Sequence, residues 1–287
     1  MRANRNRDWQ KCACVRTISL PSLCLLLLFV SPIVVIPIAA AGERLNFHKE
    51  PQPYTVQKLK SYEIVFLGTR HRKKAVLKFV AGLIPHLHET RTAHLGLEIP
   101  SDQQGKIDRF LQTGRGLNDI KLHPQLDCPE YRSLFTTIRS LDQSKRPAVV
   151  AVDLPKSMYR GEFNRDEWMA RSIAKILHRE PNAKVLVMVG NLHVLKKMEW
   201  EDTVPNAHGF IRSYLNRLVP HRHIFSIGQL IDESPNECDF TNAFSHLEGA
   251  VAMDCNERFA GWRIGFMAPV AAIPIEVCEQ LDGIIVY

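Results

Sequence analysis

The sequence lacks the motifs that identify the commonest nucleotide-binding proteins and serine hydrolases. It contains no G-x-x-x-x-G-K-[ST] phosphate loop, no G-x-G-x-x-G dinucleotide fingerprint and no G-x-S-x-G nucleophile turn. None of its cysteines is in C-x-x-C spacing, so the sequence does not predict a cysteine zinc site. Any functional residues must therefore be sought outside these motifs.

The chain also has little excess charge outside its amino terminus. The whole sequence of 287 residues carries 37 Lys and Arg against 30 Asp and Glu, a formal net charge of +7. Residues 1–41 contain five basic residues and one acid, a net charge of +4, which leaves +3 for the rest. A balance this weak does not favour a nucleic-acid partner.

The amino terminus resembles a targeting segment. A basic stretch from Arg2 to Arg16 precedes an apolar run from Leu20 to Ala41, which ends in small residues. This pattern predicts a signal peptide at residues 1–41 and an exported single domain at 42–287, periplasmic or secreted. Because the run is long for a signal peptide, an uncleaved membrane anchor is the alternative. Membrane contact is expected only through this segment.

Four cysteines lie after the leader, and three of them fall in the last fifty residues. An even number of cysteines in an exported domain predicts two disulfides, with three connectivities open, whereas four free thiols are the alternative. The residues are Cys128, Cys238, Cys255 and Cys278.

Short apolar runs alternate with segments of helical period along most of the chain. The runs predict strands at 63–67, 94–98, 147–154, 184–189 and 223–227. The segments between them predict helices at 72–88, 101–113, 129–141, 165–178 and 209–218. This alternation predicts an α/β fold, with a mostly parallel central sheet flanked by helices in Rossmann-like layers.

The two ends of this region are less regular. Residues 43–60, which are polar and contain Pro51 and Pro53, are predicted to be a loop, and so are residues 233–246. Apolar segments at 250–253, 271–275 and 284–287 predict further strands, antiparallel at the edge of the sheet.

One construction occurs twice: an apolar strand that ends in glycine and is followed by a histidine three residues later. The first unit is Gly68-Thr69-Arg70-His71 and the second is Gly190-Asn191-Leu192-His193. If both strands belong to one parallel sheet, both histidines lie at the edge where open α/β sheets bind ligands. We expect Gly68, Arg70, Gly190 and Asn191 to contact the ligand there, because glycines allow close backbone approach and Arg70 suits an anion.

Acids follow the other two strands. Glu98 ends the strand at 94–98, and Asp153 ends the strand at 147–154. His71, Glu98 and His193 together have the donor types of a divalent metal site. Without a metal, one histidine could deprotonate water while a carboxylate orients it.

Structural explanations remain open for several of these residues. In these explanations, Glu98 is the partner of Arg70 or Arg72, and Asp153 is a turn cap before Pro155. A rival histidine pair, His221 and His223, lies before the fifth predicted strand.

The two G-x-x-H units with Leu97-Glu98 between them resemble the superfamily that joins ChaN-type haem-binding lipoproteins, Tiki/TraB proteins and erythromycin esterases. The segment Glu98 to Leu111 resembles the family's glutamate-and-helix segment, and Arg165-Asp166-Glu167-Trp168-Met169-Ala170 resembles its R-D-x-x-M-A helix. The resemblance covers residues 64–230 and is nearest the ChaN-like branch.

The resemblance implies an α/β fold with a site of His71, Glu98 and His193. It implies binding of haem or a divalent metal of the iron-uptake type, or alternatively a metal-assisted or histidine-based peptidase or esterase. A scaffold without either activity is a third reading. Many relatives have glutamate where this chain has Thr69, a departure that bears on carboxylate-dependent chemistry.

Overall fold

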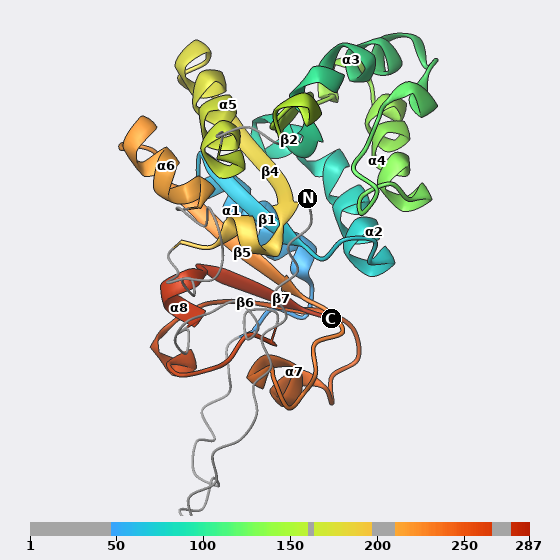
Figure 1. Cartoon of the computed structure of the whole chain (residues 1–287). Coiled ribbons are helices and arrows are strands. Elements are labelled where there is room, and N and C mark those ends of the chain that lie inside the picture. The colour runs from blue at the N-terminus through green and yellow to red at the C-terminus, as the bar shows by residue number, and fades with distance from the viewer. Residues whose placement is uncertain (1–46, 160–163, 197–209, 266–276) are drawn as a thin grey trace, which may run out of the picture. The chain divides into compact units, whose positions relative to one another are not determined.

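A seven-stranded sheet crosses the part of the chain that the computed structural model describes, residues 47–159, 164–196, 210–265 and 277–287 (Figure 1). The strand order is β3-β2-β4-β1-β5-β7-β6, and every neighbouring pair is parallel except β6 with β7. The predicted fold class, with its antiparallel edge near the carboxyl terminus, is confirmed. The strands are β1 Ile64–Thr69, β2 Thr92–Pro100, β3 Ala148–Asp153, β4 Lys184–Gly190, β5 Ile224–Leu230, β6 Val251–Asp254 and β7 Gly283–Val286.

Helices cover both faces of this sheet. The structure contains α1 Pro51–Ser61, α2 Lys74–Leu83, α3 Gln104–Thr113, α4 Pro129–Ser140, α5 Arg165–Arg179, α6 Ile211–Leu218, α7 Asp239–Phe244 and α8 Val277–Gln280. Figure 1 shows α5 and α6 on one side of the central strands and α2, α3 and α4 on the other. The two sides contribute to two separate apolar clusters.

The central strands are apolar throughout because both of their faces are buried. In β1, Ile64 and Phe66 pack in one cluster, whereas Val65 and Leu67 pack in the other. All four side chains are completely buried. Continuous apolar runs of this kind are expected for parallel strands between two helical layers.

The strand order creates a switch in connection direction between β1 and β4. The chain passes from β1 to β2 to β3 in one direction across the sheet, and from β3 to β4 to β5 in the other. Since parallel crossovers are right-handed, this reversal moves the connecting helices to the opposite face. The neighbours β1 and β4 therefore lead to helices on different faces, and ligands bind where adjacent connections diverge in this way.

The exposed edge of β3 is partly covered by a glutamine. The side chain of Gln104 donates to the Val149 carbonyl (2.8 Å) and accepts from the Ala151 N–H (2.7 Å). It thereby satisfies backbone groups that a neighbouring strand would otherwise pair, which protects the edge.

Two segments predicted to be loops contain helices. In α1, Pro51 and Pro53 lie in the first turn, where a backbone N–H has no partner within the helix and its absence in proline costs nothing. The buried residues of this helix are Tyr54, Thr55 and Leu59. The prolines were taken as loop signals, and that prediction was wrong. The second helix, α7, has only six residues and is stabilised by the burial of Phe240 and Phe244. A segment this short does not show a helical period of apolar residues in the sequence.

Some predictions lie outside the described residues. These are the leader at 1–41 and the strand at 271–275. The division into 1–41 and 42–287 stays a prediction. Among the residues that the structure describes, no helix is both long and apolar enough to cross a membrane.

The structure contains no disulfide between the four cysteines of the domain, which are free thiols. Cys128 packs against the apolar cluster under α2 and α4, whereas Cys238, Cys255 and Cys278 belong to the cluster on the opposite face. The sheet thus separates Cys128 from the other three. Two disulfides, as predicted from the even count, do not form in this arrangement.

Candidate functional site

The three predicted site residues come from three adjacent strands. His71 follows β1 by two residues, Glu98 lies near the end of β2, and His193 belongs to a short 3-10 helix, Asn191–Val194, that follows β4. β4 lies between β1 and β2 in the sheet. The structure therefore brings the two imidazoles and the carboxylate to one rim, as the strand pattern predicted.

Glu98 is at the centre of this rim and its side chain is 7% exposed. Its Oε1 accepts a hydrogen bond from Arg165 Nη2 (2.9 Å) and its Oε2 accepts from the Gly190 N–H (2.8 Å). His193 Nε2 lies 3.6 Å from Oε1. Burial raises the pKa of Glu98, but the positive charges of His193 and Arg165 outweigh it and hold the pKa below its ordinary value. The carboxylate is therefore ionised in neutral solution.

Arg165 joins Glu98 to a second acid. Its Nε and Nη2 donate to the two oxygens of Asp153, at 3.0 and 2.7 Å, in the bidentate geometry that makes such pairs strong. The Tyr159 hydroxyl also donates to Asp153 (2.8 Å), and the Tyr159 ring faces the guanidinium at 5.5 Å. Asp153 is thus more than the turn cap considered from the sequence, although it does also accept from its neighbour, the Leu154 N–H.

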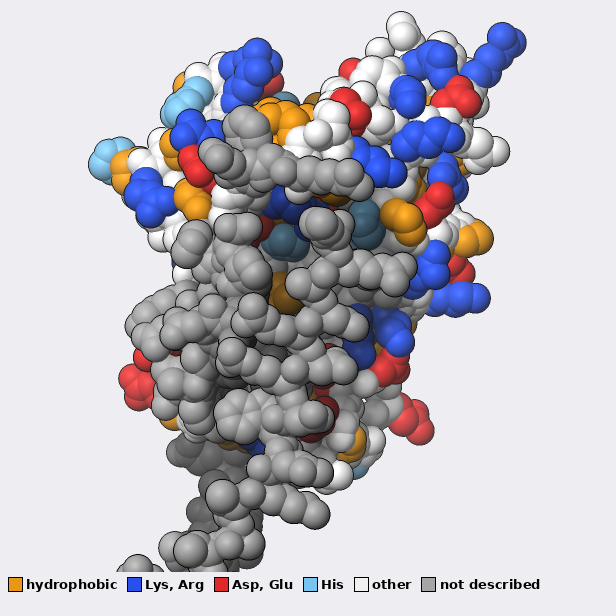
Figure 2. Space-filling model, in the orientation of Figure 1, with side chains coloured by type: hydrophobic (Ala, Val, Ile, Leu, Met, Phe, Trp, Pro, Cys, Tyr) orange, Lys and Arg blue, Asp and Glu red, His pale blue; other side chains and the backbone are white. Residues whose placement is uncertain are grey.

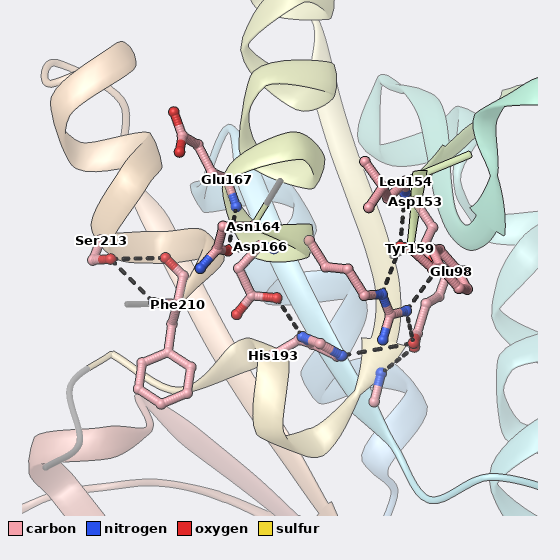
Figure 3. Close-up of polar contacts among 12 residues, drawn as sticks. Glu98, Asp153, Leu154, Tyr159, Asn164, Asp166, Glu167, His193, Phe210 and Ser213 are labelled. Atoms are coloured by element: carbon pink, nitrogen blue, oxygen red, sulfur yellow. Dashed lines mark hydrogen bonds and ion pairs between the residues drawn. The ribbon is translucent and has the colours of Figure 1, made fainter. Parts of the chain in front are cut away.

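The start of α5 holds His193 in place (Figure 3). Asn164 caps this helix by accepting from the N–H groups of Asp166 (2.9 Å) and Glu167 (3.1 Å). The Asp166 side chain then points at His193 and accepts a hydrogen bond from its Nδ1 at 2.5 Å. Burial alone would lower the pKa of His193, but the Asp166 carboxylate, supported by Glu98, raises it to about 9. His193 is therefore protonated at neutral pH.

His71 has the opposite electrostatic environment. Burial lowers its pKa below the ordinary value of 6.5, and the attraction of Glu98 offsets this only in part. Within the described residues, its Nδ1 is buried without a hydrogen-bond partner. A Cβ added at Gly190 would lie 3.5 Å from His71 Nε2 and 3.6 Å from Glu98 Oε2. The absence of a side chain at Gly190 therefore keeps the space between these two groups open.

The other predicted ligand contacts have structural partners. The Asn191 amide pairs with both backbone groups of Gln229, at 2.7 and 3.1 Å. Gly68 approaches Asn191 so closely that a Cβ there would be 2.4 Å from its oxygen, which requires glycine. Arg70 binds Glu233 and the Ile231 carbonyl. Contact of Gly68, Arg70 and Asn191 with a ligand stays a prediction.

The remaining sequence alternatives resolve differently. Neither Arg70 nor Arg72 is the partner of Glu98, because Arg72 donates to the Pro124 carbonyl (2.8 Å). The rival histidines lie before β5, at the amino end of its strand, and His223 is exposed beside Glu63 (3.3 Å). They are therefore at the opposite edge of the sheet from His71.

Two central residues of the site were not assigned roles from the sequence. Arg165 and Asp166 were noted only as part of an R-D-x-x-M-A helix. Their position after an asparagine N-cap was the available signal, since acids are expected in a first helical turn, but it did not identify their partners. Those partners are 67 and 27 residues distant in sequence.

Comparison with known proteins was informative only at the level of structure. No protein-family model matches the sequence, and no curated protein matches it. Among solved structures, an erythromycin esterase, a mutant of EreC in its open conformation, matches with a TM-score of 0.62 and 13% identity. The match covers 82% of this chain and 92% of that one. The chain has the erythromycin esterase fold.

Two further structures match less closely. A Bacillus cereus protein of unstated function has a TM-score of 0.55 and 15% identity, covering 81% of this chain and 90% of its own. The haem-bound ChaN of Campylobacter jejuni has a TM-score of 0.46 and 11% identity, covering 82% and 91%, which is too low for an inference about haem. The resemblance stated from the sequence is confirmed for the erythromycin esterase fold.

Two of the three predicted metal ligands are engaged by other residues of the cluster. His193 donates from Nδ1 to Asp166, and Glu98 accepts from Arg165, whose positive charge opposes a cation placed beside it. No group of three His, Cys, Asp or Glu side chains in the described residues is arranged to hold a metal ion. Metal binding by His71, Glu98 and His193 stays a prediction.

Proposed function

We propose that this chain is a hydrolase of esters or amides. In this reaction, His71 accepts a proton from water, and the water oxygen attacks the carbonyl carbon of the substrate. Protonated His193 and Arg165 stabilise the negative charge that develops on the substrate oxygen, and His193 gives its proton to the leaving group. This was the alternative reading of the sequence, and export through residues 1–41 belongs to the same proposal.

One observation carries the proposal: the two imidazoles at this rim have opposite surroundings, because His193 Nδ1 binds the Asp166 carboxylate whereas His71 Nδ1 is buried without a partner among the described residues. Burial keeps His71 neutral, as a general base requires, while Asp166 keeps His193 protonated, as a general acid requires. Pairs of groups whose surroundings drive their pKa values apart indicate the acid and the base of a reaction. Glu98 lies between them and can orient the water through the oxygen that faces the open space beside Gly190.

The haem or divalent metal predicted from the sequence remains the second candidate. Its support is the neutral, partly exposed imidazole of His71, because a neutral ring nitrogen is a suitable axial ligand for iron. No other group in the cluster favours it, since His193 and Glu98 are already occupied by Asp166 and Arg165.

The test compares three variants of the full chain on aryl esters and aryl amides. His71→Asn and His193→Gln are expected to lower kcat/KM by about 10²- to 10⁴-fold, the usual contribution of a general acid or base. The control is His94→Gln. His94 is a buried histidine near the amino end of β2, where it pairs with Glu180 (2.9 Å), and it lies away from the site at the carboxyl end. This variant should leave the rate unchanged.

The same preparations distinguish the second candidate. Titration with haem should give no Soret band that depends on His71, and elemental analysis should find no stoichiometric metal. Haem or metal binding lost in His71→Asn, together with no hydrolysis by the unmodified protein, would overturn the hydrolase in favour of a binding protein.

A further inference from the structure

We infer that the cavity beside this site is a subsite for an anionic group of the substrate, a carboxylate or a phosphate. The inference rests on the proposed function, because it names the substrate class of that same site. The cavity has a volume of about 270 Å³, and its lining includes Lys121, His123, Lys156 and Tyr159. Whole ligand sites are usually ~300–1,000 Å³, so this cavity suits one arm of a substrate.

Two features place the cavity next to the candidate catalytic groups. Pro100, which lines it, ends β2 two residues after Glu98. Tyr159 forms a wall shared with the site, because its hydroxyl binds Asp153 and its ring faces Arg165. A substrate with its carbonyl group between His71 and Glu98 can therefore extend into the cavity.

The polar groups of the cavity are suited to an anion. Neither Lys121 nor Lys156 forms an ion pair with any described residue, and both side chains are exposed. Asp102 is the one acid in the lining. His123 Nδ1 accepts from the Gln125 N–H (3.3 Å), which places the proton of the neutral ring on Nε2 as a further donor. These donors are available for a charge-assisted hydrogen bond.

The loop that carries Lys121 is held in position by Gln103. The Gln103 oxygen accepts from the Lys121 N–H (3.0 Å) and from Lys106 Nζ (3.1 Å). Gln103 is itself buried. The donor is thus presented from a fixed backbone, which lowers the entropy lost when a ligand binds.

In Figure 2, Lys and Arg side chains gather on the flank formed by α2, α3 and α4, beside a hollow that contains histidine side chains.

The experiment uses two ester probes that differ by one carboxylate, 4-nitrophenyl acetate and 4-nitrophenyl hemisuccinate. The unmodified chain should prefer the hemisuccinate in kcat/KM. The double variant Lys121→Gln, Lys156→Gln should lose about tenfold on the hemisuccinate, mostly in KM, and stay within about twofold on the acetate. The control double variant Lys60→Gln, Lys78→Gln removes the same charge from exposed helix positions outside the cavity and should change neither rate.

Calorimetric titration with glutarate separates this inference from the proposed function. If neither ester is hydrolysed but glutarate binds and the cavity variant loses that binding, the subsite stands and the hydrolase fails. If the esters are hydrolysed without preference for the hemisuccinate, or if both double variants lose it equally, the subsite is overturned and the hydrolase stands. Absence of both hydrolysis and glutarate binding overturns both.

Discussion

Replacing Asp166 by Asn tests the charge arrangement on which the proposed reaction depends. The carboxylate of Asp166 accepts a hydrogen bond from His193 Nδ1 at 2.5 Å, and the amide of asparagine preserves the shape but not the charge. In the unmodified protein the pKa of His193 is raised from 6.5 to about 9. Without the carboxylate, burial lowers this pKa again, and only Glu98 opposes it. We expect it to fall to near 6.5 or below.

This change should appear in the pH dependence of kcat/KM. The reaction requires neutral His71, whose pKa is lowered below 6.5, and protonated His193. Activity should therefore rise with pH on an acid limb below 6.5 and fall on an alkaline limb near 9. In Asp166→Asn the acid limb should stay, whereas the alkaline limb should move down by about two units or more, so that activity at pH 8 is almost lost.

The stability of the fold should respond with the same sign. Since the folded pKa of His193 lies above its unfolded value, its contribution is complete below pH 6.5 and is lost as the pH rises through about 9. Each unit of pKa difference corresponds to ~1.4 kcal/mol, so the contribution is about 3 kcal/mol at most. Denaturant titrations at pH 6 and pH 9.5 should show this difference in the unmodified protein and little of it in Asp166→Asn.

The matched control is Glu167→Gln at the next position of the same helix. Glu167 pairs with Arg171 (2.6 Å) and has no contact with His193 among the described residues. The alkaline limb of kcat/KM in Glu167→Gln should therefore stay where it is in the unmodified protein. An unmoved alkaline limb in a folded Asp166→Asn variant would refute the assignment of His193 as the acid.

Three further results are expected. Tyr131→Phe should leave the free energy of unfolding unchanged or raise it by up to about 1–3 kcal/mol, because the buried Tyr131 hydroxyl has no hydrogen-bond partner in the described residues; a clear loss in a denaturant titration would contradict this. Gly190→Ala should fold normally, because its Cβ would make ordinary contacts of 3.4–3.6 Å, but should lose activity by filling the space beside His71; full activity would show that water is held elsewhere. Diamide should oxidise Cys255 and Cys278 to one disulfide, since the two thiols are in hydrogen-bonding contact; peptide mapping that finds both alkylated after oxidation would contradict this.

The helices and strands were largely predictable because they depend on local sequence. The apolar run before Gly68 is buried between two helical layers, and the run before Gly190 is its parallel neighbour. Proline in the first turn of α1 misled the prediction, because the same residue type begins helices and interrupts them.

The candidate site was predictable only in part, for a topological reason. His71, Glu98 and His193 were identified because residues at the carboxyl ends of parallel strands share one edge of the sheet. Their electrostatic roles could not be read in the same way. The protonation of His71 depends on its burial and on Glu98, whereas that of His193 depends on Asp166 at the start of α5.

The sequence by itself determined the α/β class, the positions of the central strands and the residue types that end them. The tertiary structure decided that β4 inserts between β1 and β2, that Arg165 binds Glu98 and that the Asp166 carboxylate accepts a hydrogen bond from His193. It also placed Cys128 on the face opposite the other cysteines. The physical reason is that hydrophobic periodicity is a property of a few neighbouring residues, whereas an ion pair requires the final distance between segments far apart in the chain.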